Sequence, residues 1–486
     1  MFKSNNKYDE LPYLTSARRK ASPDCIATVS SLLGHKVNDP SKSRILEIGC
    51  GTGEHIITIA SSYPESYCLG VDLSPVQINM GLEFIKKLQL ENIELSVSDF
   101  NNLKAEKFDY IIAHGLMSWI PINEQKNLLE TIQKHLTNEG IAYISYNTFP
   151  GWHEKKIIRE IMLGASNLEN NIVERAKAGL LRLSQAELAL KNDTSAYSVS
   201  IQEHHKKFQK LPIWYIAHEY MEPNNNPFYF EEFSSLLNTC SLEFLGEINL
   251  DSMIASNYPA TFSKILEKEE NLIKREQLSD YFLNRSFRES LIRKKLNFKN
   301  KINTLEAVST MWIRAQVDRT PKFDTKDSFA FQFKNNTNIG ISDSIHEKAL
   351  QKLSKSWPAA VSFTELVSNS LNQKDVNAKN LADLSIFLSS IYTKNLLELF
   401  FSNPKIASIS DKPLISELAR HQINTSNTVT NSIFENVDIN DEVCKKLFPL
   451  LDGKKTKFEI AKITDLDINH INDALKKLSS KSLLTF

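Results

Sequence analysis

Short apolar runs alternate with amphipathic stretches through the first third of the chain, and this alternation predicts strands separated by helices. The apolar runs carry the β-branched and aromatic side chains of buried strands. They span residues 44–49, 67–72, 93–99, 108–114 and 141–147. The stretches between them repeat apolar residues every three or four positions, as amphipathic helices do, at residues 53–63, 74–90 and 123–140. We expect the third helix to end at Gly140, because glycine commonly terminates a helix.

Short strands joined by helices of about ten to fifteen residues indicate right-handed βαβ crossovers. The fold class predicted for this part is therefore α/β, with a Rossmann-like, doubly wound parallel sheet. Ligands of such sheets bind beyond the carboxyl ends of the strands. The residues that follow each strand are the first candidates for a functional site.

Beyond residue 147 the pattern changes and predicts further domains. Residues 152–168 and 170–191 are helical in pattern, residues 242–248 form a strand that can return to the sheet, and helices follow over 261–312. Strand alternation around an Asn-rich turn predicts a hairpin at 329–341. The remainder resembles mostly helical, winged-helix-type units. The predicted domains are residues 1–40 (N-terminal lid), 41–165 (Rossmann-like domain), 166–320 (helical insertion and a second domain) and 321–486 (winged-helix-like substrate or dimerisation domain).

The loop EIGCGTG after the first strand contains Gly49, Gly51 and Gly53, which allow a tight turn and a close approach of the backbone to a ligand. Asp72 closes the second strand, where a carboxylate can accept from both hydroxyls of a ribose. Asp99 closes the third strand, where it can meet an adenine amino group. A glycine loop alone is a weak motif, but a loop between strand and helix with two strand-end acids indicates a nucleoside cofactor.

The fourth strand ends in the sequence HGLMSWIP, which crowds His114, Met117 and Trp119 at the expected site. This segment contains no pair of carboxylates, no Ser/His/Asp arrangement and no metal-ligand spacing. His114 and Trp119 are interpreted either as packing residues or as walls of the site. Such walls suit a reaction that depends mainly on alignment of the reactants and on aromatic faces that attract a cation.

Composition narrows the possible functions. The formal charge is zero, from 58 basic and 58 acidic residues, which argues against a general polyanion binder. The densest basic run, residues 293–301, is interpreted as a solvated helix face. The five cysteines are scattered and no window approaches the roughly eighteen apolar residues of a membrane span, so a cytoplasmic protein is expected. His204 and His205 lack acidic or Cys partners at ligand spacing, so no metal site is predicted.

Five unusual segments occur in order, at residues 8–13, 113–121, 145–152, 218–233 and 281–292. Together with the glycine loop, they resemble the bacterial class I S-adenosylmethionine-dependent methyltransferases that carry a methyltransferase regulatory domain. The characterised members of that family are protein-lysine methyltransferases acting on an outer-membrane surface protein. Met117 departs from the family pattern, which has an aromatic residue at this position.

The resemblance implies S-adenosylmethionine as cofactor, S-adenosylhomocysteine as product, and a protein substrate, with nucleic acid unlikely and a homodimer possible. Tyr8 and Tyr13 are expected to form a lid segment over the cofactor. The residues expected at the cofactor are Tyr13, Glu47, Gly49, Cys50, Gly51, Gly53, Asp72, Leu73, Asp99, Phe100 and His114. The residues expected at the reaction are Tyr8, His114, Trp119, Tyr146 and Trp152.

The acceptor lysine is expected to enter between Trp119 and Trp152, near His114, Met117 and Tyr146. An ordinary lysine, with a pKa of about 10.4, is neutral in about one molecule in two thousand at pH 7. Burial and the neighbouring sulfonium favour the neutral amine, and His114 or Tyr146 is the candidate for removing a proton. Two alternatives stay open: a small-molecule or nucleic-acid methyltransferase on the same fold, and a cofactor-binding regulatory protein without turnover.

Overall fold

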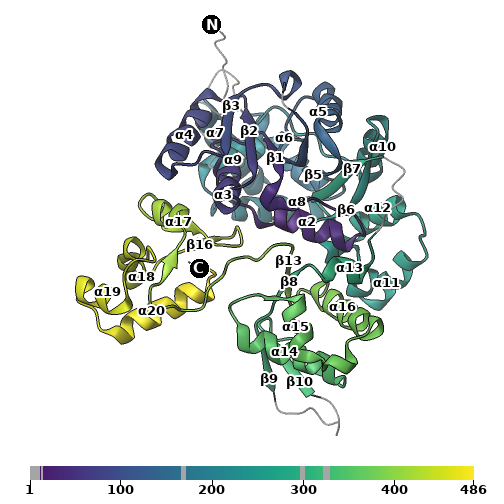
Figure 1. Ribbon diagram of the computed structural model, residues 1–486. Coiled ribbons are helices and arrows are strands. Elements are labelled where there is room, and N and C mark those ends of the chain that lie inside the picture. Colours follow the sequence, from purple (N-terminus) through teal and green to yellow (C-terminus); the bar gives the residue numbers. More distant parts are fainter. Residues whose placement is uncertain (1–10, 12–14, 105, 166–170, 296–301, 321–328) are drawn as a thin grey trace.

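The computed structural model describes residue 11 and residues 15–104, 106–165, 171–295, 302–320 and 329–486 (Figure 1). Its central element is a seven-stranded sheet in the order β3-β2-β1-β4-β5-β7-β6. The strands are β1 (Arg44–Ile48), β2 (Tyr67–Asp72), β3 (Ile93–Val97), β4 (Phe108–Ala113), β5 (Leu136–Asn147), β6 (Leu242–Glu247) and β7 (Phe287–Lys294). All are parallel except β7, which pairs antiparallel with β5 and with β6. The doubly wound sheet and its first five strands are confirmed.

Each face of the sheet has its own apolar core, because successive strand residues point to opposite faces. On one face Ile45 and Tyr143 pack with α2 (Pro23–Leu32), α3 (Glu54–Ser62) and α4 (Pro75–Leu88). On the other face Leu46 and Tyr146 pack with α5 (Ile122–His135) and α10 (Phe230–Thr239). The two tyrosines of β5 therefore lie in different cores: Tyr143 faces α2, α3 and α4, and Tyr146 faces α5 and α10.

Two predictions of secondary structure are wrong. The helix expected to end at Gly140 ends at His135, and residues 136–140 lengthen β5, where Leu136 pairs with Phe108. The helices expected over residues 261–312 are α11 (Ala260–Glu267), α12 (Leu272–Leu283) and α13 (Thr304–Val308), and strand β7 lies between the last two. The basic run at 293–301 therefore begins inside β7 and is not a helix face in its described part.

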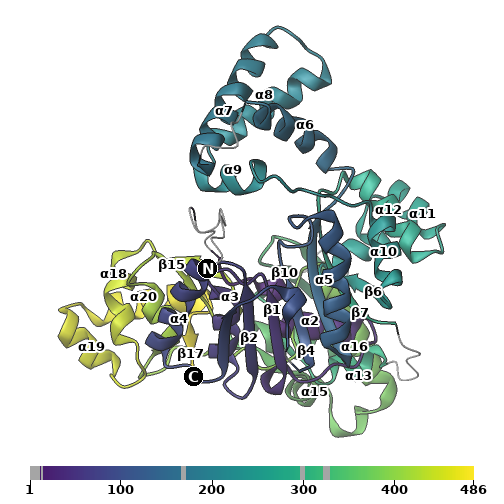
Figure 2. The same cartoon turned by 90° about the horizontal axis from the view of Figure 1, so that it is seen from above.

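Four helices follow β5 at the carboxyl edge of the sheet: α6 (Trp152–Leu163), α7 (Ile172–Ala189), α8 (Ala196–Phe208) and α9 (Ile213–Tyr220). Figure 2 shows this helical bundle standing apart from the rest of the molecule. Buried arginines close the carboxyl end of α9. Arg159 donates to the carbonyls of Tyr220 at 2.6 Å and of Glu222, and Arg175 donates to the carbonyl of Met221 at 2.6 Å. These bonds satisfy carbonyls that a helix end leaves without partners.

The C-terminal half contains two packed units. The first has its own core between Ala307 and Leu399 and contains strands β8 (Trp312–Arg314), β9 (Val317–Thr320), β10 (Phe329–Phe333), β11 (Asn338–Ile341), β12 (Val361–Ser362) and β13 (Glu398–Phe400), with α13, α14 (Ser344–Ser356), α15 (Phe363–Ser370) and α16 (Ala378–Tyr392). The hairpin predicted at 329–341 is confirmed as the β10–β11 pair. Because β9 also pairs with β10, the division predicted at 320/321 falls inside this unit.

The second C-terminal unit has a core between Ile415 and Leu484. It contains β14 (Leu414–Ile415), α17 (Glu417–Gln422), β15 (Thr428–Thr430), β16 (Asn436–Asp438), α18 (Glu442–Leu447), α19 (Lys457–Thr464), α20 (Ile468–Ser480) and β17 (Leu484–Thr485). This unit docks on the sheet's helices: Phe434 packs in the core of the α2–α3–α4 face, and Gln422 Nε2 donates to Glu54 Oε1 at 2.9 Å.

The strand β7 is held by a buried charge network around Arg288, whose side chain has no exposed surface. The guanidinium donates to both carboxylate oxygens of Asp280, at 2.9 and 2.8 Å, to Glu247 Oε1 at 2.7 Å and to Glu276 Oε2 at 3.2 Å. Burial would raise the pKa of Glu247, but the attraction of Arg288 and Arg285 outweighs it and lowers the pKa. Arg288 thus compensates carboxylates that have no access to water.

Replacing Arg288 with alanine should destabilise the protein by about 3–5 kcal/mol, because buried carboxylates would lose their countercharge. Urea unfolding followed by circular dichroism measures the change. The matched control is Arg182→Ala on α7, an exposed arginine, for which a change below about 0.5 kcal/mol is expected. Equal effects of the two substitutions would contradict the role given to Arg288.

Candidate active site

The strand order reverses between β1 and β4, so the chain leaves these neighbouring strands toward opposite faces and opens a crevice at their carboxyl ends. The glycine loop lies at this point. Gly49, Gly51 and Gly53 have φ of 74°, 57° and 75°, a region that other residues avoid. A Cβ on Gly51 would lie 2.6 Å from Thr15 Cγ2. The loop therefore needs glycine both for its backbone and for its close neighbours.

Asp72 ties the glycine loop to the end of β2. Its carboxylate accepts from Gly51 N and from Ser74 N, both at 2.9 Å. Leu73 follows with 57% of its surface exposed, an unusual position for leucine. At the end of β3, Asp99 accepts from Asn101 N at 2.9 Å and begins the short helix η3 (Phe100–Asn102). The structure thus brings the predicted cofactor residues of three strand ends to one edge of the sheet.

Glu47 is buried on the α3 face beneath the glycine loop, with 6% of its surface exposed. Burial raises the pKa of its carboxyl to about 8, against the opposing attraction of Arg18. Its Oε2 has no hydrogen-bond partner among the described residues. A buried acceptor without a donor is costly unless a ligand supplies one. Cys50, beside it, is buried and its thiol pKa is raised by burial, so its side chain fills space.

The N-terminal segment runs across this edge of the sheet. Thr15 Oγ1 lies 2.5 Å from Thr52 Oγ1 in the glycine loop, and Arg18 N donates to His55 Nδ1 at 3.2 Å. Closer to the N-terminus, the carbonyl oxygen of Leu11 lies 2.9 Å from Nε2 of His218 in the helical bundle. The segment therefore joins the bundle to the loop. Tyr8 and Tyr13, the lid residues predicted from the sequence, lie outside the described residues.

His114 stands directly after β4, opposite the glycine loop. Its Nδ1 lies 3.0 Å from Tyr143 Oη and 3.3 Å from Ser145 Oγ, and Ser145 Oγ accepts from Gly115 N at 2.7 Å. The imidazole stacks on the Tyr143 ring and meets Phe287 edge-on. Burial, helped by the charge of Arg18, holds the pKa of His114 well below its usual value, so the ring is neutral. Within the part of the chain that the structure describes, its other nitrogen, Nε2, makes no hydrogen bond.

Trp119 and Trp152 lie together, but the slot predicted between them is absent. Their ring centroids are 6.4 Å apart in an edge-to-face arrangement, which is direct contact. Trp152 is 1% exposed, and Met117 is fully buried in the core on the α5 face. An acceptor chain can therefore pass beside this pair but not between its rings. Met117, which was expected near the acceptor, belongs instead to this buried core.

Tyr146 is also displaced from its predicted position. It points to the α10 face, where its ring stacks on Phe233 at 4.1 Å and its hydroxyl lies 3.1 Å from Ser290 Oγ. His114 lies on the opposite face with Tyr143, so Tyr146 does not reach the site. Sequence reasoning missed Arg18, Tyr143 and Ser145. The two-residue period of β5 could have identified the last two, since it puts positions 143 and 145 on one face and position 146 on the other.

The strand order, with one antiparallel strand between β5 and β6, and a glycine loop at the switch point define a class I methyltransferase. Three family descriptions match the chain. Residues 39–210 match a methyltransferase domain, residues 214–294 a predicted methyltransferase regulatory domain, and residues 411–481 the C-terminal winged-helix domain of PKMT.

Two uncharacterised proteins of Rickettsia prowazekii are similar in sequence. One is 29% identical over 453 residues, covering 90% of this chain and 81% of that protein, and the other is 35% identical over 237 residues, covering 48% and 95%. PKMT2 from Rickettsia typhi, also solved in complex with AdoHcy, has the same fold, with a TM-score of 0.82 at 24% identity over 97% of this chain and 100% of that one. The chain belongs to the family of S-adenosylmethionine-dependent methyltransferases that carry a methyltransferase regulatory domain.

The hydrogen-bonding groups of the site match those of S-adenosylmethionine. Glu47 offers a buried acceptor for an ammonium group, Asp72 offers a carboxylate at the second strand end, and the glycine loop leaves backbone close to a ligand. When bound, S-adenosylmethionine supplies an electrophilic methyl group on a sulfonium. Within the described residues no group of three or more His, Cys, Asp or Glu side chains could hold a metal ion. No helix in the same part of the chain has the length and apolar character needed to cross a membrane.

Cofactor binding should release a proton from Glu47. With a pKa of about 8, this carboxyl is mostly protonated in the free protein at pH 7, and an ammonium group beside it favours the ionised form. Affinity should therefore rise as the pH rises toward 8. Calorimetry at pH 7 in buffers of different ionisation enthalpy measures the proton. The control Glu47→Gln should release none, and buffer-independent heats in the unchanged protein would contradict the assignment.

Asp72→Ala should weaken S-adenosylmethionine binding on the order of tenfold or more, because hydrogen bonds to a carboxylate contribute about 1.5–3 kcal/mol each. Asp72→Asn is the matched variant: it keeps one acceptor for the ribose and should have an intermediate affinity. Calorimetric titration at constant pH gives both values. Affinity equal to that of the unchanged protein in Asp72→Ala would remove Asp72 from the cofactor site.

Proposed function

We propose that the protein is a protein-lysine N-methyltransferase. The observation that carries this proposal is the place of His114 directly after β4, where its Nδ1 is held by Tyr143 and no hydrogen bond to Nε2 occurs among the described residues. Burial keeps the pKa of this imidazole well below its usual value, which favours the neutral ring. An amine must lose a proton before it can accept a methyl group, and a neutral ring nitrogen can receive that proton. The rings of Tyr143 and Phe287 beside His114 suit an alkyl chain that carries the amine.

The choice of a protein acceptor rests on the C-terminal half. Residues 411–481 match the winged-helix domain of PKMT, an abbreviation for protein lysine methyltransferase, and the whole chain has the fold of PKMT2. A class I methyltransferase core is complete without these units, so we assign them to substrate recognition or to a homodimer surface. We further propose a cytoplasmic enzyme whose substrate is an outer-membrane surface protein, on the resemblance of the five sequence segments to that family.

The placement of several side chains supports the residue roles that we propose. We assign Asp72 to the ribose, Asp99 with Phe100 and Leu73 to the adenine, and Glu47 to the methionine ammonium group. Arg18 is close enough to Glu47 and His114 to influence both pKa values. Tyr8 and Tyr13 keep their proposed role as a lid, which is supported by the contacts of Leu11 with the bundle and of Thr15 with the loop.

The test supplies methyl-labelled S-adenosylmethionine and a bacterial lysate to the protein, and separates protein, RNA and small molecules. Label should enter protein, and mass spectrometry of the labelled peptides should place one to three methyl groups on lysine. The control is Asp72→Ala at a cofactor concentration below its weakened affinity, which should transfer little label. Label on arginine, glutamine or a carboxylate would overturn the lysine assignment, and label in RNA or metabolites alone would overturn the protein assignment.

A further inference from the structure

A chain of hydrogen bonds leads from His114 away from the site. Tyr143 Oη donates to Glu289 Oε1 at 2.7 Å, and a carboxylate can only accept. The phenol has one hydrogen, so its oxygen must accept from His114 Nδ1 at 3.0 Å. Nδ1 therefore carries the ring hydrogen, and Nε2 is the nitrogen with the lone pair. Ser145 Oγ, at 3.3 Å from Nδ1, already accepts from Gly115 N and keeps the ring in place.

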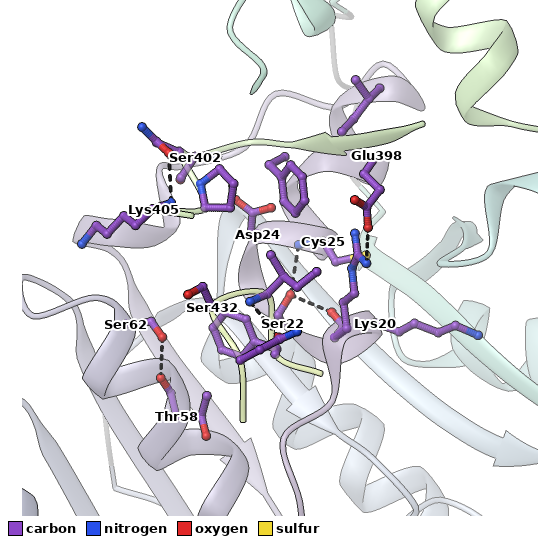
Figure 3. A pocket seen from close by; sticks show the side chains of 18 of the residues that line it. Lys20, Ser22, Asp24, Cys25, Thr58, Ser62, Glu398, Ser402, Lys405 and Ser432 are labelled. Carbon is purple, nitrogen blue, oxygen red and sulfur yellow. Dashed lines mark hydrogen bonds and ion pairs between the residues drawn. The ribbon is translucent and has the colours of Figure 1, made fainter. Parts of the chain in front are cut away.

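The end of this series of hydrogen bonds, at Glu289, is partly exposed to solvent. Glu289 Oε2 accepts from Lys20 Nζ at 3.2 Å, and the side chains of Glu289 and Lys20 are 14% and 50% exposed. Lys20 lines a cavity of about 510 Å³ where the start of α2 meets α3 and both C-terminal units (Figure 3). The carboxylate thus lies between a buried tyrosine and a half-exposed lysine.

Neither His114 nor Tyr143 can hold the proton alone. The pKa of His114 is held well below its usual value by burial and by Arg18, so an imidazolium is disfavoured. The pKa of Tyr143 is raised well above its usual value by burial and by Glu289, so a tyrosinate is disfavoured as well. The titratable or charged groups that face the pair are Arg18 from the N-terminal segment, His55 from α3, Cys25 from α2 and Glu289 from β7.

We infer that His114, Tyr143 and Glu289 form a proton relay that neutralises the acceptor amine. This inference rests on the proposed lysine acceptor. The ammonium gives a proton to His114 Nε2, the Nδ1 hydrogen passes to Tyr143 Oη, and the phenol hydrogen passes to Glu289 Oε1. His114 gains a proton at Nε2 and loses one at Nδ1, and Tyr143 both gains and loses a proton at Oη. Both side chains therefore stay neutral. Only the ammonium and the carboxylate change charge, and both become neutral.

The transfer converts an ammonium and a carboxylate into two neutral groups. Burial favours this change, because both charged groups lose solvation free energy when they are removed from water. After the product leaves, the reverse passage returns the hydrogens to Tyr143 and to Nδ1, and Nε2 releases one proton to water. Glu289 is then a carboxylate again, held by Lys20. In this scheme His114 touches the acceptor, while Tyr143 and Glu289 act through it as positioning and proton-holding residues.

The experiment compares Tyr143→Phe and Glu289→Gln with the full-length protein. Glutamine keeps an acceptor for the tyrosine hydroxyl but cannot take its proton. At pH 7 both variants should lose on the order of 10²-fold in kcat on a lysine peptide, with unchanged affinity for S-adenosylmethionine. The deficit should shrink toward pH 10, where lysine deprotonates in solution. The matched control is Glu243→Gln, on the neighbouring strand and paired with Arg293, with wild-type kinetics at both pH values.

A second measurement does not depend on activity. In ¹⁵N-histidine-labelled protein without cofactor, the His114 ring, identified by the signal lost in His114→Gln, should carry its hydrogen on Nδ1. In Glu289→Gln the amide N–H can also donate to Tyr143 Oη, which lets the phenol donate to Nδ1, so a share of the ring hydrogen should move to Nε2. An Nε2–H ring in the unchanged protein, or variants with wild-type rates and pH profiles, would overturn the relay. Whether the unchanged protein methylates lysine at all tests the proposed function separately.

Discussion

The insertion of β7 between β5 and β6 is the constraint on which the rest of the structure depends. This strand comes from residues 287–294, far along the chain from the five strands it completes, and it runs against both neighbours. Its consecutive residues face opposite sides of the sheet. Arg288 enters the buried carboxylate network on one face, and Glu289 reaches Tyr143 and Lys20 on the other. Two consecutive residues of β7 therefore serve different roles: Arg288 stabilises the packing of the sheet, and Glu289 contacts the tyrosine beside His114.

Two buried groups of the site stay neutral beside the carboxylates of Asp72 and Asp99. Glu47 is mostly protonated when nothing pairs with it, and burial disfavours the cation of His114. A cationic cofactor beside Glu47 favours its ionised form. The N-terminal segment adds Arg18 and contacts the glycine loop through Thr15, so a part of the chain outside the sheet lies against the same edge as the loop.

The sequence predicted the first five strands well because β1, β2, β4 and the second half of β5 are buried along most of their length, which gives each a nearly continuous apolar run. It failed at β7, where Arg288, Glu289, Arg293 and Lys294 interrupt the apolar pattern. Those charges are satisfied by partners as distant as Glu247 and Lys20, which no local pattern shows. The glycine loop and both strand-end acids lie where expected, because their positions follow from strand ends alone.

The reaction side of the site was harder to predict. His114 follows β4 as expected, but Tyr146 and Met117 belong to the opposite core, because side-chain direction depends on the register between β4 and β5. Trp119 and Trp152 were identified as neighbours, yet their mutual contact depends on how α6 leaves the sheet. Tertiary packing decides whether two aromatic rings leave a space between them or touch. The sequence alone does not give the distance between the Trp119 and Trp152 rings.

The docking of the last unit on α3 has a consequence for stability. Glu54 is the first residue of the helix that begins at the glycine loop, and it accepts from Gln422, while Phe434 packs beside His55 of the same helix. A ligand that binds only the native loop stabilises everything that must be folded with that loop. Through these contacts on α3, a cofactor that binds the glycine loop should also protect residues 415–484 from local unfolding.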